Sequence, residues 1–146
     1  MKERTGSSRG RAGRCITPAM AYILVVEDEA DSGNVLCEFL RRSGHDAVCM
    51  PNGKEALGAI LKKTPDLIVL DLFMPEMDGA GLLEIVRGYL KLTSLPVIIY
   101  TGLPDSPAAD RARHLKVNAI LMKGRASHLD VVAAVQHELP RAPRAG

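Results

Sequence analysis

The chain has 146 residues, of which 47% are apolar and 25% charged, so it is long enough for one domain with a sizeable core. Aromatic residues make up only 3% and Trp is absent, which favours an aliphatic core of the kind that lies between a parallel sheet and its helices. The sequence contains no apolar stretch of the ~18 residues that a membrane-spanning helix needs. No secretory apolar region lies near its N-terminus, so we expect neither a membrane protein nor a secreted one.

The net charge of +2 is unevenly distributed along the chain. Residues 1–19 hold five basic side chains and one acid, whereas residues 20–139 sum to −4, a balance that does not favour nucleic-acid binding. We expect a disordered basic extension over 1–19, a folded domain over 20–139 and a tail over 140–146. A natural start at Met20 also fits, because the strand pattern begins directly after it. The three cysteines are odd in number and lack metal-ligand spacing, which indicates a reduced, cytoplasmic location.

Apolar residues alternate along the chain between short runs, typical of buried strands, and helical spacing. The expected strands are Tyr22–Val26, Asp46–Met50, Asp66–Leu70, Leu95–Tyr100 and Asn118–Met122. The expected helices are Ala30–Ser43, Gly53–Lys63, Asp78–Leu90, Asp105–Leu115 and Ser127–Leu139. Five strand–helix units in strict alternation predict an α/β fold with a five-stranded parallel sheet, right-handed crossovers and helices on both faces.

Helical spacing of apolar residues also predicts which side of each helix faces the sheet. The residues expected to face inward are Val35, Leu36, Phe39 and Leu40, then Ala56, Leu57, Ile60 and Leu61, then Leu82, Leu83, Val86 and Leu90, and finally Leu129, Val132, Val135 and Leu139. The helix over 105–115 offers only alanines as inward anchors, so we expect it to be weakly held. The four histidines are expected at the surface or at helix ends.

Functional side chains follow four of the five expected strands. Glu27 and Asp28 follow the first strand, Asp71 the third, Thr101 the fourth and Lys123 the fifth. The carboxyl ends of parallel strands meet at the edge where open α/β sheets bind ligands. Clustered carboxylates repel one another and need a cation, and hard oxygen donors suit Mg²⁺. An acidic cluster at 27–29 is also compatible with capping of the first helix.

These motifs, in this order, resemble the receiver domain of two-component response regulators. The resemblance covers about residues 21–139 and rests on Glu27-Asp28, on Asp71 within the segment 71–79, on Thr101 and on Lys123. The separations of 30 residues between Asp71 and Thr101, and of 22 between Thr101 and Lys123, are also similar to those of the family. The resemblance implies a stand-alone receiver with a flavodoxin-like (βα)5 fold.

The resemblance also implies a role for each residue. Asp71 would take a phosphoryl group from a sensor histidine kinase or phosphotransfer protein, in a Mg²⁺-dependent reaction. Asp28 and Asp71 would bind Mg²⁺ directly, Glu27 through water, and Phe73 through its backbone carbonyl. Lys123 would place a positive charge, and Thr101 a hydroxyl, on the phosphoryl oxygens. The output would be altered binding of a downstream protein, and the only catalysis would be the chain's own phosphorylation and dephosphorylation.

The sequence departs from the family pattern at several positions. Gly124 stands where Pro usually follows the lysine, and Ile120 stands where the family often has a Tyr or Phe that moves inward on phosphorylation. Phe73 and Leu103 occupy places that border the path of the hydrolytic water, and both are apolar. We therefore expect the aspartyl phosphate to be long-lived.

Three alternative functions remain open from the sequence. One is a receiver-like binding module that works without phosphorylation. Another is a phosphatase that forms an aspartyl phosphate, but such enzymes need an acid two residues after the nucleophile, where this chain has Phe73. A dinucleotide-binding enzyme is disfavoured, because no glycine-rich turn follows the first strand.

Overall fold

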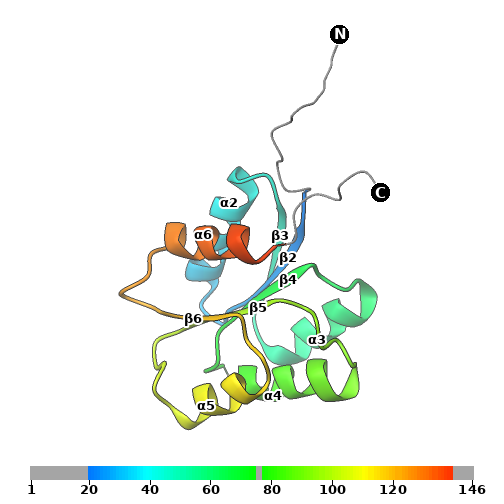
Figure 1. Ribbon diagram of the computed structural model, residues 1–146. Coiled ribbons are helices and arrows are strands. Elements are labelled where there is room, and N and C mark those ends of the chain that lie inside the picture. Colours follow the sequence, from blue (N-terminus) through cyan, green and yellow to red (C-terminus); the bar gives the residue numbers. More distant parts are fainter. Residues whose placement is uncertain (1–19, 75–76, 140–146) are drawn as a thin grey trace.

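The computed structural model describes residues 20–74 and 77–139, and it contains all of the expected strands and helices (Figure 1). The strands are β2 (Tyr22–Val26), β3 (Asp46–Met50), β4 (Leu67–Leu70), β5 (Val97–Thr101) and β6 (Ala119–Met122). The helices are α2 (Ala30–Arg42), α3 (Gly53–Lys62), α4 (Gly79–Glu84), the π-helical η1 (Ile85–Tyr89), α5 (Pro107–His114) and α6 (His128–Glu138). The expected extension over 1–19 and tail over 140–146 lie outside the described residues. Among the described helices, none has both the length and the apolar character needed to cross a membrane.

The five strands form one parallel sheet in the order β3-β2-β4-β5-β6 (Figure 1). This confirms the predicted α/β class and the flavodoxin-like arrangement. The chain runs outward from β2 to β3 and then returns to β4 on the other side of β2, so its direction reverses between β2 and β4. In doubly wound sheets this reversal opens a crevice at the carboxyl ends of the two strands.

The strand ends are aligned by their register. Val26 pairs with Leu70 across β2 and β4, and Thr101 pairs with Met122 across β5 and β6. The ladder then continues one residue past two of the strands: the Asp71 N–H donates to the Val26 carbonyl at 3.0 Å, and the Lys123 N–H donates to the Thr101 carbonyl at 2.9 Å. The main chain at both positions is thereby fixed at the edge of the sheet.

Two hydrophobic clusters cover the two faces of the sheet. Alternate residues of β2 point to opposite faces, so Ile23 and Val25 enter one cluster while Leu24 and Val26 enter the other. Helices α2 and α6 pack over the first face, and α3, α4 and α5 pack over the second (Figure 1). Burial of each of these side chains contributes roughly 1.5–3 kcal/mol, so the aliphatic core predicted from composition is the main source of stability.

Three of the residues predicted to face inward are exposed instead. Val35, Leu61 and Leu129 have 43%, 66% and 64% of their surface exposed, whereas Cys37 and Val131 are buried. The buried positions of α2 are Gly33, Leu36, Cys37 and Leu40, a strict helical stripe. The exposed residues lie just outside such stripes, where an apolar side chain is tolerated at the surface.

The third predicted helix is not α-helical throughout. Its second half is the π-helical segment η1, and this segment carries Arg87, which is only 7% exposed. The guanidinium of Arg87 donates to the carbonyls of Leu92, Leu115 and Lys116 at 2.6, 2.8 and 2.9 Å. Burial lowers the pKa of Arg87, and each of its three guanidinium nitrogens donates one hydrogen bond to a carbonyl. Arg87 therefore ties η1 to the loop that follows it and to the end of α5.

His45 is a second buried polar residue, three residues after the end of α2, whereas the sequence predicted a position at the surface or at a helix end. It is 5% exposed. Its Nδ1 accepts a hydrogen bond from the Ala21 N–H at 3.3 Å, and its Nε2 lies 3.2 Å from Oε1 of Gln136. Because both ring nitrogens have partners, His45 is a satisfied core residue that joins β2 to α6.

Candidate functional site

Glu27 and Asp28 follow β2 at the carboxyl edge of the sheet. Glu27 is 5% exposed, whereas Asp28 is exposed. Oε2 of Glu27 accepts a hydrogen bond from the Glu29 N–H at 3.2 Å, and Glu29, at the cap position of α2, makes no side-chain capping bond. The local bond of Glu27 organises the turn into α2, and its other oxygen faces the sheet edge.

Asp71 follows β4 and is 6% exposed. Its Oδ1 accepts a hydrogen bond from the Phe73 N–H at 3.2 Å. The cap of α4 is formed by Asp78 instead, whose Oδ1 accepts from the Gly81 N–H at 2.7 Å. Asp71 is therefore not needed to start α4, and its second oxygen, Oδ2, lies 3.2 Å from Nζ of Lys123.

The structure brings the three predicted acids together. One carboxylate oxygen from each of Glu27, Asp28 and Asp71 lies within 4.8 Å of the other two. Three carboxylates opposite the single ammonium of Lys123 leave two formal negative charges in the cluster. Hard oxygen donors with this charge fit a divalent cation such as Mg²⁺.

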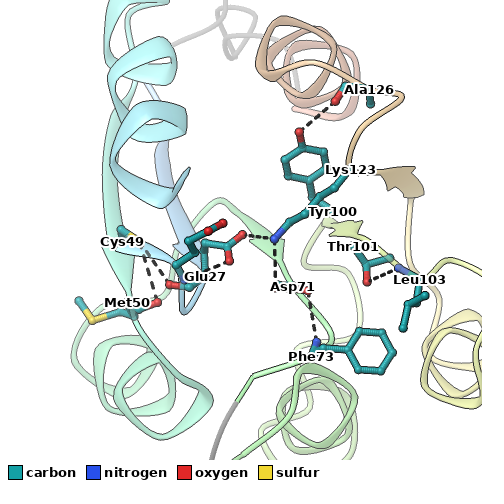
Figure 2. Close-up of polar contacts among 11 residues, drawn as sticks. Glu27, Cys49, Met50, Asp71, Phe73, Tyr100, Thr101, Leu103, Lys123 and Ala126 are labelled. Carbon is teal, nitrogen blue, oxygen red and sulfur yellow. Dashed lines mark hydrogen bonds and ion pairs between the residues drawn. The ribbon is translucent and has the colours of Figure 1, made fainter. Parts of the chain in front are cut away.

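Lys123 reaches the acid cluster from β6. Its Nζ lies 2.6 Å from Oε1 of Glu27 and 3.2 Å from Oδ2 of Asp71 (Figure 2). The lysine side chain is 26% exposed, while the two carboxylates are 6% and 7% exposed. The ammonium thus joins the ends of β2 and β4 at a site largely shielded from water, where ion pairs are stronger than at the surface.

Burial and charge act in opposite directions on these groups. Burial raises the pKa of Glu27, the hydrogen bond from Lys123 lowers it in part, and the charge of Asp71 raises it further. Burial alone would lower the pKa of Lys123, but the hydrogen bond to Glu27 and the charge of Asp71 outweigh it and hold this pKa above its ordinary value. Lys123 is therefore a permanent positive charge at neutral pH.

Thr101 is the last residue of β5 and is fully buried. Its Oγ1 accepts a hydrogen bond from the Leu103 N–H at 3.3 Å. A hydroxyl that accepts one bond can still donate its own proton to another acceptor. Figure 2 shows Thr101 on the opposite side of Asp71 from Glu27, in keeping with the strand order.

Apolar side chains and a surface cavity border the site on the β5–β6 side. Phe73 and Leu103 are 42% and 60% exposed, and both appear beside Thr101 in Figure 2. A cavity of about 580 Å³ opens next to Leu103. Its lining is formed by Gly102, Leu103, Pro104, Asp105, Ile120, Met122 and Arg125. Ile120 thus lines this cavity at the position where the family often has the larger ring of a Tyr or Phe.

One residue of this region was missed by sequence reasoning. Tyr100 immediately precedes Thr101, and its hydroxyl donates to the Ala126 carbonyl at 2.9 Å. The Nζ of Lys123 lies 5.8 Å from the centroid of the Tyr100 ring. The only signal in the sequence was a tyrosine, one of five aromatic residues in the chain, inside an otherwise aliphatic strand.

A five-stranded parallel sheet with an acid cluster, a threonine and a lysine at its carboxyl edge defines a signalling domain of the receiver type. The family model for the response regulator receiver domain matches residues 23–135, so the chain belongs to that family. Membership of this family supports a role in two-component signalling.

Several known proteins are similar to this chain. A probable transcriptional regulator ycf27 of Porphyridium aerugineum is 37% identical over 97 residues, which are 66% of this chain and 38% of that protein. An uncharacterised 14.6 kDa protein of Leptolyngbya boryana is 41% identical over 86 residues, 59% of this chain and 66% of that protein. The crystal structure of the signal receiver domain of a Syntrophus aciditrophicus signal transduction histidine kinase superposes with a TM-score of 0.73 at 30% identity, covering 82% of this chain and 89% of that one. The chain therefore spans well under half the length of the ycf27 relative.

Proposed function

We propose that this chain is a phospho-accepting receiver of a two-component phosphorelay, with Asp71 as the phosphorylated residue. The phosphoryl donor would be a phosphohistidine on a sensor histidine kinase or phosphotransfer protein, and the reaction would take place in the cytoplasm. The observation that carries the proposal is the setting of Asp71. Its buried carboxylate lies 3.2 Å from the Lys123 ammonium and within 4.8 Å of oxygens from two further acids.

The chemistry of the transfer follows from this setting. An oxygen of Asp71 attacks phosphorus, the P–N bond to the donor histidine breaks, and the electron pair passes to the imidazole nitrogen, which takes up a proton. The residues proposed to hold Mg²⁺ are Asp28 and Asp71 directly, Glu27 through water and Phe73 through its carbonyl. Bound Mg²⁺ supplies the charge neutralisation that lets an anionic carboxylate approach an anionic phosphoryl group.

Lys123 and Thr101 act on the phosphoryl group after transfer. Phosphorylation raises the negative charge at Asp71 to about −2, which attracts the ammonium of Lys123 and the hydroxyl of Thr101. Movement of Thr101 would carry the loop over 102–105, which lines the surface cavity. We propose that this loop, with α5, β6 and α6, forms the surface whose two arrangements bind a downstream protein differently.

A receiver-like module that binds its partner without phosphorylation is the second candidate. It is favoured by Gly124, whose backbone φ of +91° shows a loop built differently from one with Pro after the lysine, and by Ile120 in the wall of the cavity. The proximity of Asp71 and Lys123 supports the phospho-accepting function instead. The phosphatase alternative is disfavoured, because Phe73 offers no acid to protonate a leaving group.

Labelling with a small phosphodonor tests the proposal. The wild-type chain, Asp71→Asn and the control Asp46→Asn would be incubated with acetyl phosphate and Mg²⁺ and examined by intact-mass spectrometry. Asp46 begins β3, at the opposite end of the strands. We expect one phosphoryl group per chain in the wild type and in Asp46→Asn, and none in Asp71→Asn. An unlabelled wild type would instead favour the phosphorylation-independent module.

A further inference from the structure

Tyr100 connects β5 to the loop that carries Lys123. Its side chain is 7% exposed and belongs to the hydrophobic cluster beneath α2 and α6. Its hydroxyl donates a hydrogen bond to the carbonyl of Ala126 at 2.9 Å (Figure 2). Ala126 lies three residues after Lys123, in the loop between β6 and α6. The loop thus satisfies the hydroxyl of the buried phenol.

The loop contains a flexible position directly beside the lysine. Gly124 has a φ of +91°, which L side chains rarely adopt. Among the described residues other than its two chain neighbours, no atom lies within 4 Å of the place where a Cβ would stand. Both Gly124 and Arg125 are exposed. Glycine has more backbone freedom than any other residue. Backbone hydrogen bonds from the Lys123 N–H to the Thr101 carbonyl at 2.9 Å and from the Ala126 N–H to the Met122 carbonyl at 2.8 Å hold the main chain on either side of Gly124, and the side-chain contacts of Tyr100 add to them.

Tyr100 provides contacts on both sides of that glycine. Before it, the Lys123 Nζ lies 5.8 Å from the centroid of the Tyr100 ring, within the range of a cation–π contact. After it, Ala126 accepts the hydrogen bond from the Tyr100 hydroxyl. The same side chain therefore spans the flexible position and restrains the loop at residues 123 and 126.

We infer that Tyr100 is a positioning residue for Lys123, which holds its ammonium between Glu27 and Asp71 and offsets the freedom introduced by Gly124. The effect on phosphoryl transfer rests on the proposed function, whereas the effect on the loop does not. A tyrosine serving only as core filling would need its ring but not its hydroxyl. Tyr100→Phe therefore separates the two roles, because it removes the hydroxyl and keeps the ring.

Tyr22 offers a matched control. It lies at the start of β2, away from the strand ends that form the site, and its ring also has a lysine over it, with Nζ of Lys63 at 4.8 Å from the centroid. Tyr22 is half-buried, and burial raises the pKa of both tyrosines. Tyr22→Phe removes the same hydroxyl at a place with no path to Lys123.

The first measurement is amide hydrogen exchange over residues 123–127, with neither phosphodonor nor Mg²⁺. We expect exchange in Tyr100→Phe to be about fivefold faster than in the wild type, the factor that corresponds to one typical hydrogen bond. Tyr22→Phe should match the wild type in this segment. Unchanged exchange over 123–127 in Tyr100→Phe would overturn the inference.

The second measurement is a double-mutant cycle on the rate of phosphorylation by acetyl phosphate with Mg²⁺. We expect Tyr100→Phe to slow the reaction in the wild-type background and to have no further effect in Lys123→Ala, because its action passes through that lysine. Equal slowing in both backgrounds would show a merely structural role and overturn the inference. If the wild type accepts no phosphoryl group, the proposed function fails, and the exchange measurement alone decides the role of Tyr100.

Discussion

Lys123 makes two ion pairs with groups that the sequence places 96 and 52 residues away. The residues of this cluster could be anticipated because each directly follows, or ends, a short apolar run, and parallel strands end at a common edge. The distances between these side chains could not be predicted, since they depend on side-chain conformations. The hydrogen bond between Tyr100 and Ala126 could not be predicted for a related reason. The two residues are 26 positions apart, and neither residue type indicates which group the tyrosine hydroxyl will contact.

Phe73 and Leu103 bear on the lifetime of the phosphorylated state. Both are apolar and more than two-fifths exposed, so neither can orient an attacking water by hydrogen bonding. We predict that Phe73→Asn shortens the lifetime of the aspartyl phosphate by about tenfold, a modest positioning effect. The measurement is the decay of labelled protein in Mg²⁺ after removal of the donor. Leu61→Asn, an exposed apolar position on α3, is the control, and equal lifetimes in wild type and Phe73→Asn would refute the prediction.

At the scale of elements, α4 begins against the strand end that carries Asp71. A Cβ on Gly79 would stand 2.9 Å from Cα of Leu72 and would also collide with the Asp71 carbonyl. A Cβ on Gly58 in α3 would meet no atom of the described residues within 4 Å apart from its own helix. We predict that Gly79→Ala lowers the free energy of unfolding by about 1–3 kcal/mol and slows phosphorylation, since backbone must shift to make room. Gly58→Ala should be neutral or stabilising by about 1 kcal/mol.

Urea denaturation of both alanine variants, with labelling by acetyl phosphate, checks this pair. Comparing Gly79→Ala with Gly58→Ala separates the effect of the steric clash from the general effect of replacing a glycine in a helix. A Gly79→Ala protein as stable and as reactive as Gly58→Ala would show that the approach of α4 to the Asp71 segment does not matter.

The π-helical segment η1 is the element that was hardest to predict from the sequence. Its apolar residues continue the helical pattern of α4, and an arginine within such a pattern indicates a surface position. The π-helical segment includes Arg87, which lies four residues after the buried Leu83 and next to the buried Val86. It therefore falls on the inward side of the helix, where three carbonyls accept hydrogen bonds from its guanidinium. Neither the π-helical turn nor the acceptors are visible in local sequence.

The buried guanidinium gives a stability prediction. Arg87→Met should lower the free energy of unfolding by about 3 kcal/mol or more, because three carbonyls lose charge-assisted hydrogen bonds. Arg42→Met is the control, since the Arg42 side chain is 71% exposed and pairs with Glu38 at 3.2 Å, an interaction of roughly 0–1 kcal/mol. Equal denaturation midpoints for the two variants would contradict this account of η1.

For the whole molecule, alternation of strands and helices was enough to predict the parallel sheet and its two covering layers. It could not predict which apolar residues at the margins of a helix stay exposed, such as Leu61 and Leu129, because an apolar side chain at the surface costs little. The sheet as a whole gathers acids from β2 and β4, and the net negative charge of that cluster should couple metal binding to global stability.

We predict that Mg²⁺ stabilises the fold in proportion to its binding, by about 2.7 kcal/mol at a concentration of 100 times its Kd. Thermal denaturation with and without Mg²⁺ measures the effect. Asp28→Asn should lose most of it, because one of the proposed ligands is neutralised, whereas Asp46→Asn should retain it. Equal Mg²⁺ stabilisation of wild type and Asp28→Asn would rule out this acid cluster as the metal site.

The most direct test of the account is phosphorus NMR of the whole chain mixed with acetyl phosphate and Mg²⁺. We predict one protein-bound acyl phosphate signal, which does not form when Mg²⁺ is chelated before the donor is added and is absent from Asp71→Asn. A protein-bound signal that persists in Asp71→Asn, or a wild-type protein that never gives one, would contradict this prediction.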